Sequence, residues 1–153
     1  MPFMSHAPFV PLRVFSCYTM LDGAIEPKLI AKAAAELAFP AVALTDRNGL
    51  YAAMAFSDGC ASNGVQPIIG TMLGIARPQR GDGAGTGTDW LALYAQDEAG
   101  YTNICKLVSM AHLDRPPHED PHVLLSDLHG LTDGVLCLTA GGEGALARLA
   151  AEG

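Results

Sequence analysis

The chain has 153 residues and a mass of 16.0 kDa, 50% of its residues are apolar, and its formal charge is −7 with a pI of about 5.0. At this length we expect one domain with a hydrophobic core, which excludes disorder of the whole chain. The sequence has nine Lys and Arg residues and 16 Asp and Glu residues, and the basic residues do not form a cluster. Binding of nucleic acid by this chain alone is therefore not expected, because phosphate neutralisation needs a clustered positive face.

Membrane, secreted and zinc-ribbon classes are also disfavoured. No apolar run approaches the roughly 20 residues of a membrane-spanning helix, and the N-terminus lacks the basic region of a signal peptide. The four cysteines (Cys17, Cys60, Cys105 and Cys137) form no Cys-x-x-Cys pair. These features predict a cytoplasmic protein with reduced thiols and no membrane contact.

In the first half of the chain, strand-like apolar runs alternate with amphipathic helical patterns. Pro27 stands where a first helical residue is favoured, and Pro40 ends that helical pattern. We predict, in chain order, a strand over 12–16, a helix over 27–38, a strand over 41–45, a helix over 51–61 and a strand within 66–76.

The alternation continues after a glycine-rich stretch. We expect flexible loops near 77–88 and 115–121, and Asp97 is a candidate N-cap. The remaining predictions are a strand over 90–95, a helix through Ala111, a short helix over 123–128, a strand over 135–139 with Cys137 in the core, and a last helix to Ala150. The order predicts an α/β fold with mostly parallel strands and outer helices; it does not decide between an open sheet and a barrel.

Two apparent motifs carry little functional weight. Residues 118–122 spell His-Glu-x-x-His, which binds zinc only when both histidines lie on one face of a helix. Pro116, Pro117 and Pro121 make a helix there very unfavourable. The glycines of 81–87 lie between two predicted strands, whereas a phosphate cradle needs a strand followed by a helix, so a linker is the better interpretation.

Charged residues at the ends of two predicted strands are more informative. Arg13 and Asp22 accompany the first strand, and Asp46 and Arg47 follow the second. Because active groups collect at the carboxyl edge of parallel sheets, these four residues are candidates for one shared cleft. The competing interpretation is structural, with Asp22-Gly23 forming a turn and Thr45-Asp46 capping a helix.

Several ordered blocks give the chain a family resemblance. Residues 12–24 resemble the opening motif of the PHP (polymerase and histidinol phosphatase) domain, as found at the N-terminus of the alpha subunits of bacterial replicative DNA polymerase III. The likeness continues in the same order, with similar gaps, through 43–46, 66–70, 94–101, 107–113 and 138–142. It therefore covers nearly the whole chain.

The resemblance implies a distorted barrel of seven strands with outer helices, of which this chain would hold an incomplete part. It also implies a metal site, since active members bind a trinuclear cluster and act as phosphoesterases. In this sequence the family's ligand positions inside the chain carry Arg13, Phe15, Asp22, Arg47, Met72, Trp90 and Gly141. A last ligand pair of the family would lie beyond Gly153.

This substitution pattern predicts an inactive metal site with no catalytic residue and no bound metal. A cluster of cations needs imidazoles and carboxylates, and an arginine cannot lose its charge to become a ligand. We expect Arg13 and Arg47 to neutralise Asp22 and Asp46 instead. The alternative is a metal-dependent phosphoesterase or nuclease with an atypical ligand set drawn from Asp22, Asp46, His112, His118 and His122.

The resemblance also suggests a role inside a larger protein. Residues 1–153 would be the N-terminal part of a PHP domain in a polymerase subunit that acts as a DNA-directed nucleotidyltransferase in replication. The expected partners are the remainder of that subunit and a separate proofreading exonuclease subunit. DNA and the catalytic Mg would be engaged elsewhere in the parent polymerase, with no cofactor in this segment. Exposed strand edges of an incomplete barrel would also favour self-association.

Overall fold

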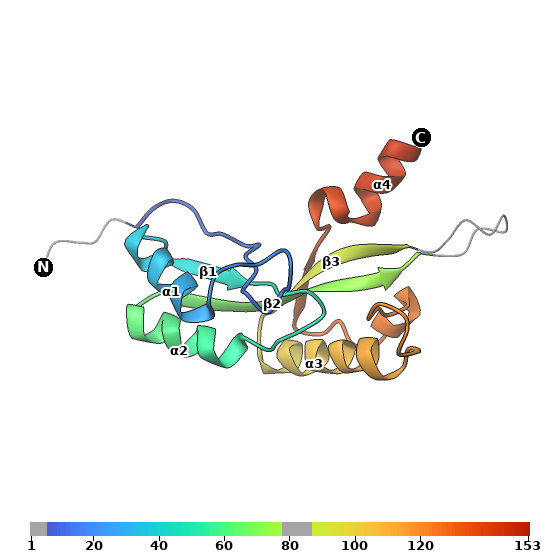
Figure 1. The fold of residues 1–153 in the computed structure, drawn as a ribbon, viewed down its shortest axis with the longest axis horizontal. Coiled ribbons are helices and arrows are strands. Elements are labelled where there is room, and N and C mark those ends of the chain that lie inside the picture. The colour runs from blue at the N-terminus through green and yellow to red at the C-terminus, as the bar shows by residue number, and fades with distance from the viewer. Residues whose placement is uncertain (1–5, 78–86) are drawn as a thin grey trace, which may run out of the picture. The chain divides into compact units, whose positions relative to one another are not determined.

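The computed structural model describes residues 6–77 and 87–153 (Figure 1). Its sheet has the strand order β1-β2-β3-β4. The chain forms two compact units. The first contains residues 1–46 and 50–70, and the second contains 47–49 and 71–153. Strand β2 (Gln66–Ala76) contributes to both units.

The first unit is a pair of helices packed on a short parallel strand pair. Strand β1 (Ala41–Leu44) runs parallel to the first residues of β2. Helix α1 (Pro27–Glu36) packs against α2 (Ala53–Asn63), which ends at Gly64 with a φ of 68°. The shared core consists of Ile30, Ala31, Ala34, Val42, Leu44, Ala52, Phe56, Cys60 and Val65.

The prediction of a strand over 12–16 is wrong. This segment makes only one isolated bridge, between Ser16 and Ile25. It does lie beside β1, because Ala43 N donates to Pro11 O at 2.8 Å and Thr45 N donates to Val14 O at 2.9 Å. Its apolar residues predicted an extended backbone, but a strand also requires a continuous ladder.

The second unit is built around an antiparallel pair. Strand β3 (Thr88–Ala95) pairs with β4 (Val135–Leu138), and helix α3 (Glu98–Leu113) packs against both. Asp97 is the N-cap of α3, as the sequence predicts, with its Oδ1 accepting from Gly100 N at 2.8 Å. Two 3₁₀ turns, η1 (Leu125–Leu128) and η2 (Gly141–Glu143), and helix α4 (Ala145–Glu152) complete the unit.

The prediction of mostly parallel strands therefore holds for β1 and β2 but is wrong for β3 and β4. Gln96 N, at the end of β3, donates to Gly134 O, directly before β4, at 2.8 Å. The chain thus enters β4 where β3 ends, and the two strands must run in opposite directions. Alternation of helices and strands does not encode this direction. A closed barrel is not seen among the four strands.

Smaller corrections concern exposure and helix bounds. Strand β4 is last in the strand order, and Cys137 is exposed rather than in the core. The helix predicted over 51–61 begins and ends two residues later. Residues 116–122 hold no helix or strand, whereas 78–86 of the first expected loop lie outside the described residues. Within the described ranges no helix has the length and apolar character needed to cross a bilayer.

Candidate functional site

In the first unit, Asp46 is a buried carboxylate with three hydrogen-bond donors. It follows β1 and is only 2% exposed. Ser16 donates to it through its backbone N–H and its hydroxyl, both at 2.7 Å, and the Thr19 hydroxyl donates at 2.8 Å. Burial of a carboxylate is tolerable when such donors surround it. Asp46 therefore anchors the turn that follows residue 16, a role that the sequence analysis missed for Ser16 and Thr19.

The other candidates of the first unit lie on its surface. The Arg13 guanidinium carbon lies 5.5 Å from the centre of the Phe15 ring, within the range of a cation–π contact. Asp22 is exposed, and its backbone N–H donates to Thr19 O at 3.3 Å. A Cβ on Gly23 would collide with the carbonyl oxygen of Ser16. Asp22 and Gly23 thus lie at a turn, and the candidate cleft that includes Asp22 stays a prediction.

The second unit brings three of the expected metal-ligand positions together. Arg47 and Met72 form a parallel bridge, and Met72 is fully buried. The Arg47 guanidinium carbon lies 4.4 Å from the centre of the Trp90 ring. Its Nη2 donates to Glu143 Oε1 at 2.7 Å, with both side chains partly buried. Glu143 lies two residues after Gly141, but the sequence contained no signal that marked it as the partner of Arg47.

These residues do not suit a metal cluster. A guanidinium always keeps its charge, an indole offers only an N–H donor, and a thioether is a soft ligand unlike those of phosphoesterase cations. Among residues 6–77 and 87–153, no group of three His, Cys, Asp or Glu side chains could hold a metal ion. The predicted pairing of Arg13 and Arg47 with Asp22 and Asp46 stays a prediction.

Two of the three histidines named as alternative ligands make hydrogen bonds with backbone carbonyls. His112 Nε2 lies 2.7 Å from Asn48 O, and His122 Nδ1 lies 2.8 Å from Asp120 O, so each nitrogen carries the proton in the neutral ring. Glu119 lies between His118 and His122, with oxygen-to-Nε2 distances of 4.0 and 3.9 Å. This loop is not helical, which confirms that its His-Glu-x-x-His letters are not a zinc-protease motif.

A cavity of about 1220 Å³ in the second unit contains part of this group. Its lining includes Arg47, Trp90, His112 and His122. Asn48 also lines it and organises its wall, accepting from Gly74 N at 2.8 Å and donating to Pro121 O at 2.7 Å. Asn48 has a φ of 45°, a left-handed conformation that asparagine tolerates. Asn48 is not among the candidates predicted from the sequence, although an Asn-Gly pair after a strand is a turn signal.

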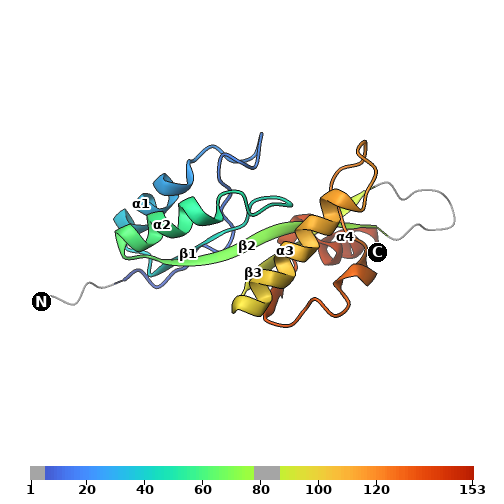
Figure 2. The same cartoon turned by 90° about the horizontal axis from the view of Figure 1, so that it is seen from below.

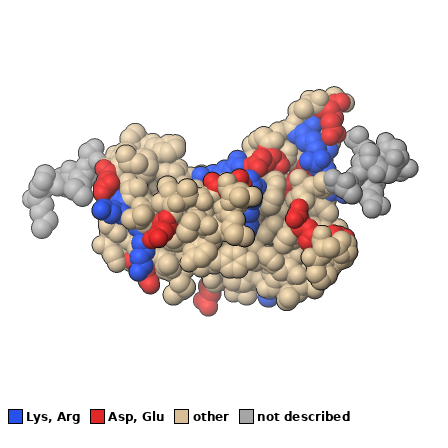
Figure 3. All heavy atoms as spheres, viewed as in Figure 1, with Lys and Arg blue, Asp and Glu red and all other residues tan. Residues whose placement is uncertain are grey.

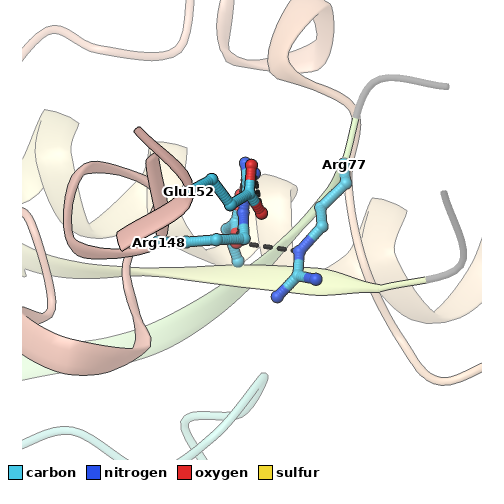
Figure 4. Close-up of polar contacts among 4 residues, drawn as sticks. Arg77, Arg148 and Glu152 are labelled. Atoms are coloured by element: carbon cyan, nitrogen blue, oxygen red, sulfur yellow. Dashed lines mark hydrogen bonds and ion pairs between the residues drawn. The ribbon is translucent and has the colours of Figure 1, made fainter. Parts of the chain in front are cut away.

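A second buried carboxylate, Asp89, joins three elements of the same unit (Figure 4). Arg148 of α4 donates to it from Nε at 2.9 Å and Nη2 at 2.8 Å, and Arg77 Nε donates at 3.0 Å. Arg148 also contacts Glu152 at 3.1 Å. The hydrogen bonds from Arg148, followed by those from Arg77, hold the pKa of Asp89 below its usual value despite burial. Donating these hydrogen bonds to Asp89 raises the pKa of Arg148. This network fastens α4 to β3.

Comparison with known proteins identifies relatives along most of the chain. The PHP domain model matches residues 11–153. The chain is 39% identical over 150 residues to a DNA polymerase III subunit alpha from Caulobacter vibrioides, covering 95% of this chain and 13% of that protein. It is 40% identical over 115 residues to an error-prone DNA polymerase from Anaeromyxobacter, covering 71% and 9%. The chain thus spans about an eighth of the length of the first relative.

Among solved structures, an amidohydrolase from Chromobacterium violaceum aligns with a TM-score of 0.51. The sequence identity is 19%, and the alignment covers 67% of this chain and 33% of that one. This likeness concerns the fold alone. The family match over residues 11–153 and the similarity to these polymerase subunits show that the chain belongs to the PHP domain family and is homologous to the N-terminal region of DNA polymerase III alpha subunits.

Proposed function

We propose that this PHP domain is catalytically inactive and serves as a scaffold and docking domain within a replicative DNA polymerase alpha subunit. The observation that carries this proposal is the arrangement of Arg47 in the second unit. Its guanidinium stacks on Trp90 and pairs with Glu143 beside the buried Met72. All three of Arg47, Met72 and Trp90 occupy positions where the family resemblance places metal ligands.

The physical case against catalysis is electrostatic. A phosphoesterase cluster places several cations close together and needs ligands that offset their charge. Arg47 adds a fixed positive charge in that place, and Glu143 already accepts its hydrogen bond at 2.7 Å. A metal cation at this place would therefore lack Glu143 as a ligand, and it would also lack the negative charge of Glu143 to offset its own. The arginine supplies a permanent cation that needs no metal.

Our proposal for the wider protein follows from the relatives. The parent subunit polymerises DNA in the cytoplasm with Mg at a site outside this segment, and the PHP domain supports it and docks the proofreading exonuclease subunit. DNA is held by the holoenzyme rather than by this domain. In keeping with that, acidic and basic residues are interspersed on the face shown in Figure 3, and the chain carries a net charge of −7. The exposed residues of strand β4 would also favour self-association.

Metal analysis tests the proposal most directly. The chain is purified after growth with added Zn and Mn, without chelator, and its metal content is measured by mass spectrometry. A metal-binding PHP phosphoesterase is treated in parallel as the control. We expect substoichiometric metal and no hydrolysis of a phosphomonoester. Several metal ions per chain together with hydrolysis would instead support the phosphoesterase with an atypical ligand set.

A further inference from the structure

In the second unit, one asparagine side chain holds a loop segment against β2. Residues 119–123, which we call the strap, follow α3, and Figure 2 shows this orange segment leaving the end of the helix and turning back. Val123 forms a parallel bridge with Ile75 of β2, and its N–H donates to Gly74 O at 2.9 Å. Residues 119–122 also line the cavity of this unit. The strap is therefore part of the cavity wall.

The side-chain amide of Asn48 joins the strap to β2. Its Nδ2 donates to Pro121 O at 2.7 Å, and its Oδ1 accepts from Gly74 N at 2.8 Å. Asn48 is only 7% exposed, so both hydrogen bonds form where water is largely excluded. An amide can donate and accept at once, whereas a carboxylate can only accept. The bond to the strap therefore depends on the amide nitrogen of Asn48.

Asn48 is followed by Gly49, and an Asn-Gly pair is chemically unstable in an unconstrained chain. The backbone nitrogen of the glycine, once it loses its proton, attacks the side-chain carbonyl carbon of the asparagine. A bond forms between that nitrogen and Cγ, the bond from Cγ to Nδ2 breaks, and ammonia leaves with a proton. Water then opens the cyclic imide to aspartate or isoaspartate. Glycine favours this reaction because it has no Cβ to hinder the attack.

The fold holds both reacting groups of this pair away from the reaction. Gly49 N donates to Thr71 Oγ1 at 3.3 Å, and the Asn48 amide is bound to the strap and to β2. The attack requires both groups to leave these partners. The amide is released from Pro121 when the strap opens, and such local opening is an ordinary fluctuation of folded proteins.

We propose that Asn48 is a site of spontaneous deamidation, that the strap controls its rate, and that the product releases the strap from β2. An aspartate formed at this position keeps one oxygen for Gly74 N. Its second oxygen replaces Nδ2 and faces Pro121 O, which lies 2.7 Å from that atom. Two acceptors, one of them charged, cannot share a hydrogen bond, so the strap loses this contact. Because ammonia is lost, the change acts in one direction only and opens this side of the cavity.

The rate of deamidation tests the first two parts of the proposal. The whole chain is kept in mildly alkaline buffer, folded or in urea, and peptide mapping by mass spectrometry follows Asn48 and Asn63. Asn63 is the internal reference, because it belongs to the other Asn-Gly pair of the sequence and is exposed at the end of α2. In urea we expect similar rates at the two sites. Folding should slow Asn48 by about tenfold or more relative to Asn63, because opening must break buried hydrogen bonds.

Two results would overturn these parts. If Asn48 does not deamidate in urea, it is not a deamidation site. If folding slows Asn48 and Asn63 equally, burial under the strap has no influence on the reaction.

Control by the strap is tested from its other end with Arg115→Ala. Arg115 Nε donates to His122 O at 3.2 Å, and the guanidinium pairs with Asp127. Loss of these contacts should loosen the strap without touching Asn48, so deamidation of Asn48 in the folded chain should become severalfold faster. Lys106→Ala, at an exposed position on α3, removes the same charge and should leave the rate unchanged.

The rate at Asn63 separates a local from a general effect of Arg115→Ala. It should stay at its wild-type value. An unchanged rate at Asn48, or an equal increase at both asparagines, would contradict control by the strap.

The variant Asn48→Asp tests the effect of the product on the strap. Aspartate tolerates the φ of 45° at this position, so we expect folding to be retained. Hydrogen exchange is measured at Val123 N and at Ala76 N, which donates to Val123 O at 2.9 Å. We expect exchange to become about tenfold faster or more. Wild-type chain that has been deamidated in urea and refolded should show the same change.

Asn63→Asp is the matched control, because it makes the same chemical change at the exposed Asn-Gly pair. It should leave exchange at Val123 and Ala76 as in the wild type. Unchanged exchange at these two amides in both Asn48→Asp and the refolded, deamidated chain would show that the product does not release the strap. An equal increase in Asn63→Asp would show that the effect is not specific to Asn48.

Discussion

Two buried carboxylates, one in each unit, are stabilised in different ways. Asp46 accepts from a backbone N–H and two hydroxyls of residues 16 and 19, all of them neutral donors. Asp89 accepts from the guanidinium groups of Arg77 and Arg148. Their exposures are similar, at 2% and 5%, so burial does not distinguish them.

The difference reflects what each carboxylate holds in place. Neutral donors on a tight turn are preorganised by the turn's own backbone, so Asp46 fixes the shape of a short segment. Long arginine side chains reach between elements, and Asp89 joins α4 to the end of β2 and to β3. Hydrogen bonds to neutral donors should be insensitive to salt, whereas ion pairs with partly exposed arginines should be screened.

The largest effect is expected at Asp46. Asp46→Ala leaves the buried donors of Ser16 and Thr19 without an acceptor, and we expect a loss of about 3 kcal/mol in the free energy of unfolding. Urea denaturation measures this loss. Asp58→Ala is the control, because Asp58 is exposed on α2 in the same unit. Equal stability of the two variants would show that the three bonds to Asp46 contribute nothing net.

A smaller loss is expected at Asp89. Asp89→Asn removes the charge that Arg77 and Arg148 share but keeps the shape and one acceptor oxygen, so we expect a loss of about 2 kcal/mol. Hydrogen exchange should also show faster opening of α4, which is fastened through Arg148. Asp114→Asn, at an exposed position after α3, is the control. Unchanged exchange in α4 would contradict the role of Asp89 in fastening this helix.

The pH dependence of stability sharpens the comparison. Because the two arginines lower the folded-state pKa of Asp89 from 3.8, its stabilising contribution is fully present above that value. The contribution is lost as the pH falls through the lower folded-state pKa. Wild type and Asp89→Asn should therefore differ in stability at neutral pH and converge in strongly acidic solution, as followed by thermal unfolding. A difference that stays constant from neutral pH to about pH 2 would contradict this linkage.

The smallest effect concerns salt. At 1 M salt the Debye length is about 3 Å, so the loss caused by Asp89→Asn should shrink by a few tenths of a kcal/mol, and the part of the loss caused by Asp46→Ala that comes from its bonds to Ser16 and Thr19 should not shrink. Lys32→Ala, which breaks an exposed pair with Glu36 on α1, serves as a reference for weak surface electrostatics. Equal salt responses of the two aspartate variants would show that the distinction between neutral and charged donors has no energetic consequence.

Much of the secondary structure could be predicted from local signals. Pro27 and Asp97 mark the starts of α1 and α3 because their effects on the backbone are local. Strand β2 spans the predicted residues 66–76. The strand predicted over 12–16 failed, since extended residues form a strand only if a partner supplies a ladder. The direction of β4 also depended on a contact, between Gln96 and Gly134, that no local pattern encodes.

The candidate site, like the fold, could be predicted from the sequence only in part. By itself the sequence determined the family, because a family pattern is a property of residues and their order. The resemblance also predicts that arginine, methionine and tryptophan stand where a cluster would need imidazoles and carboxylates. Only the tertiary structure decided that Arg47 pairs with Glu143, 96 residues away, and stacks on Trp90. Such pairings depend on how distant elements pack, and a charged side chain has many compatible partners along the chain.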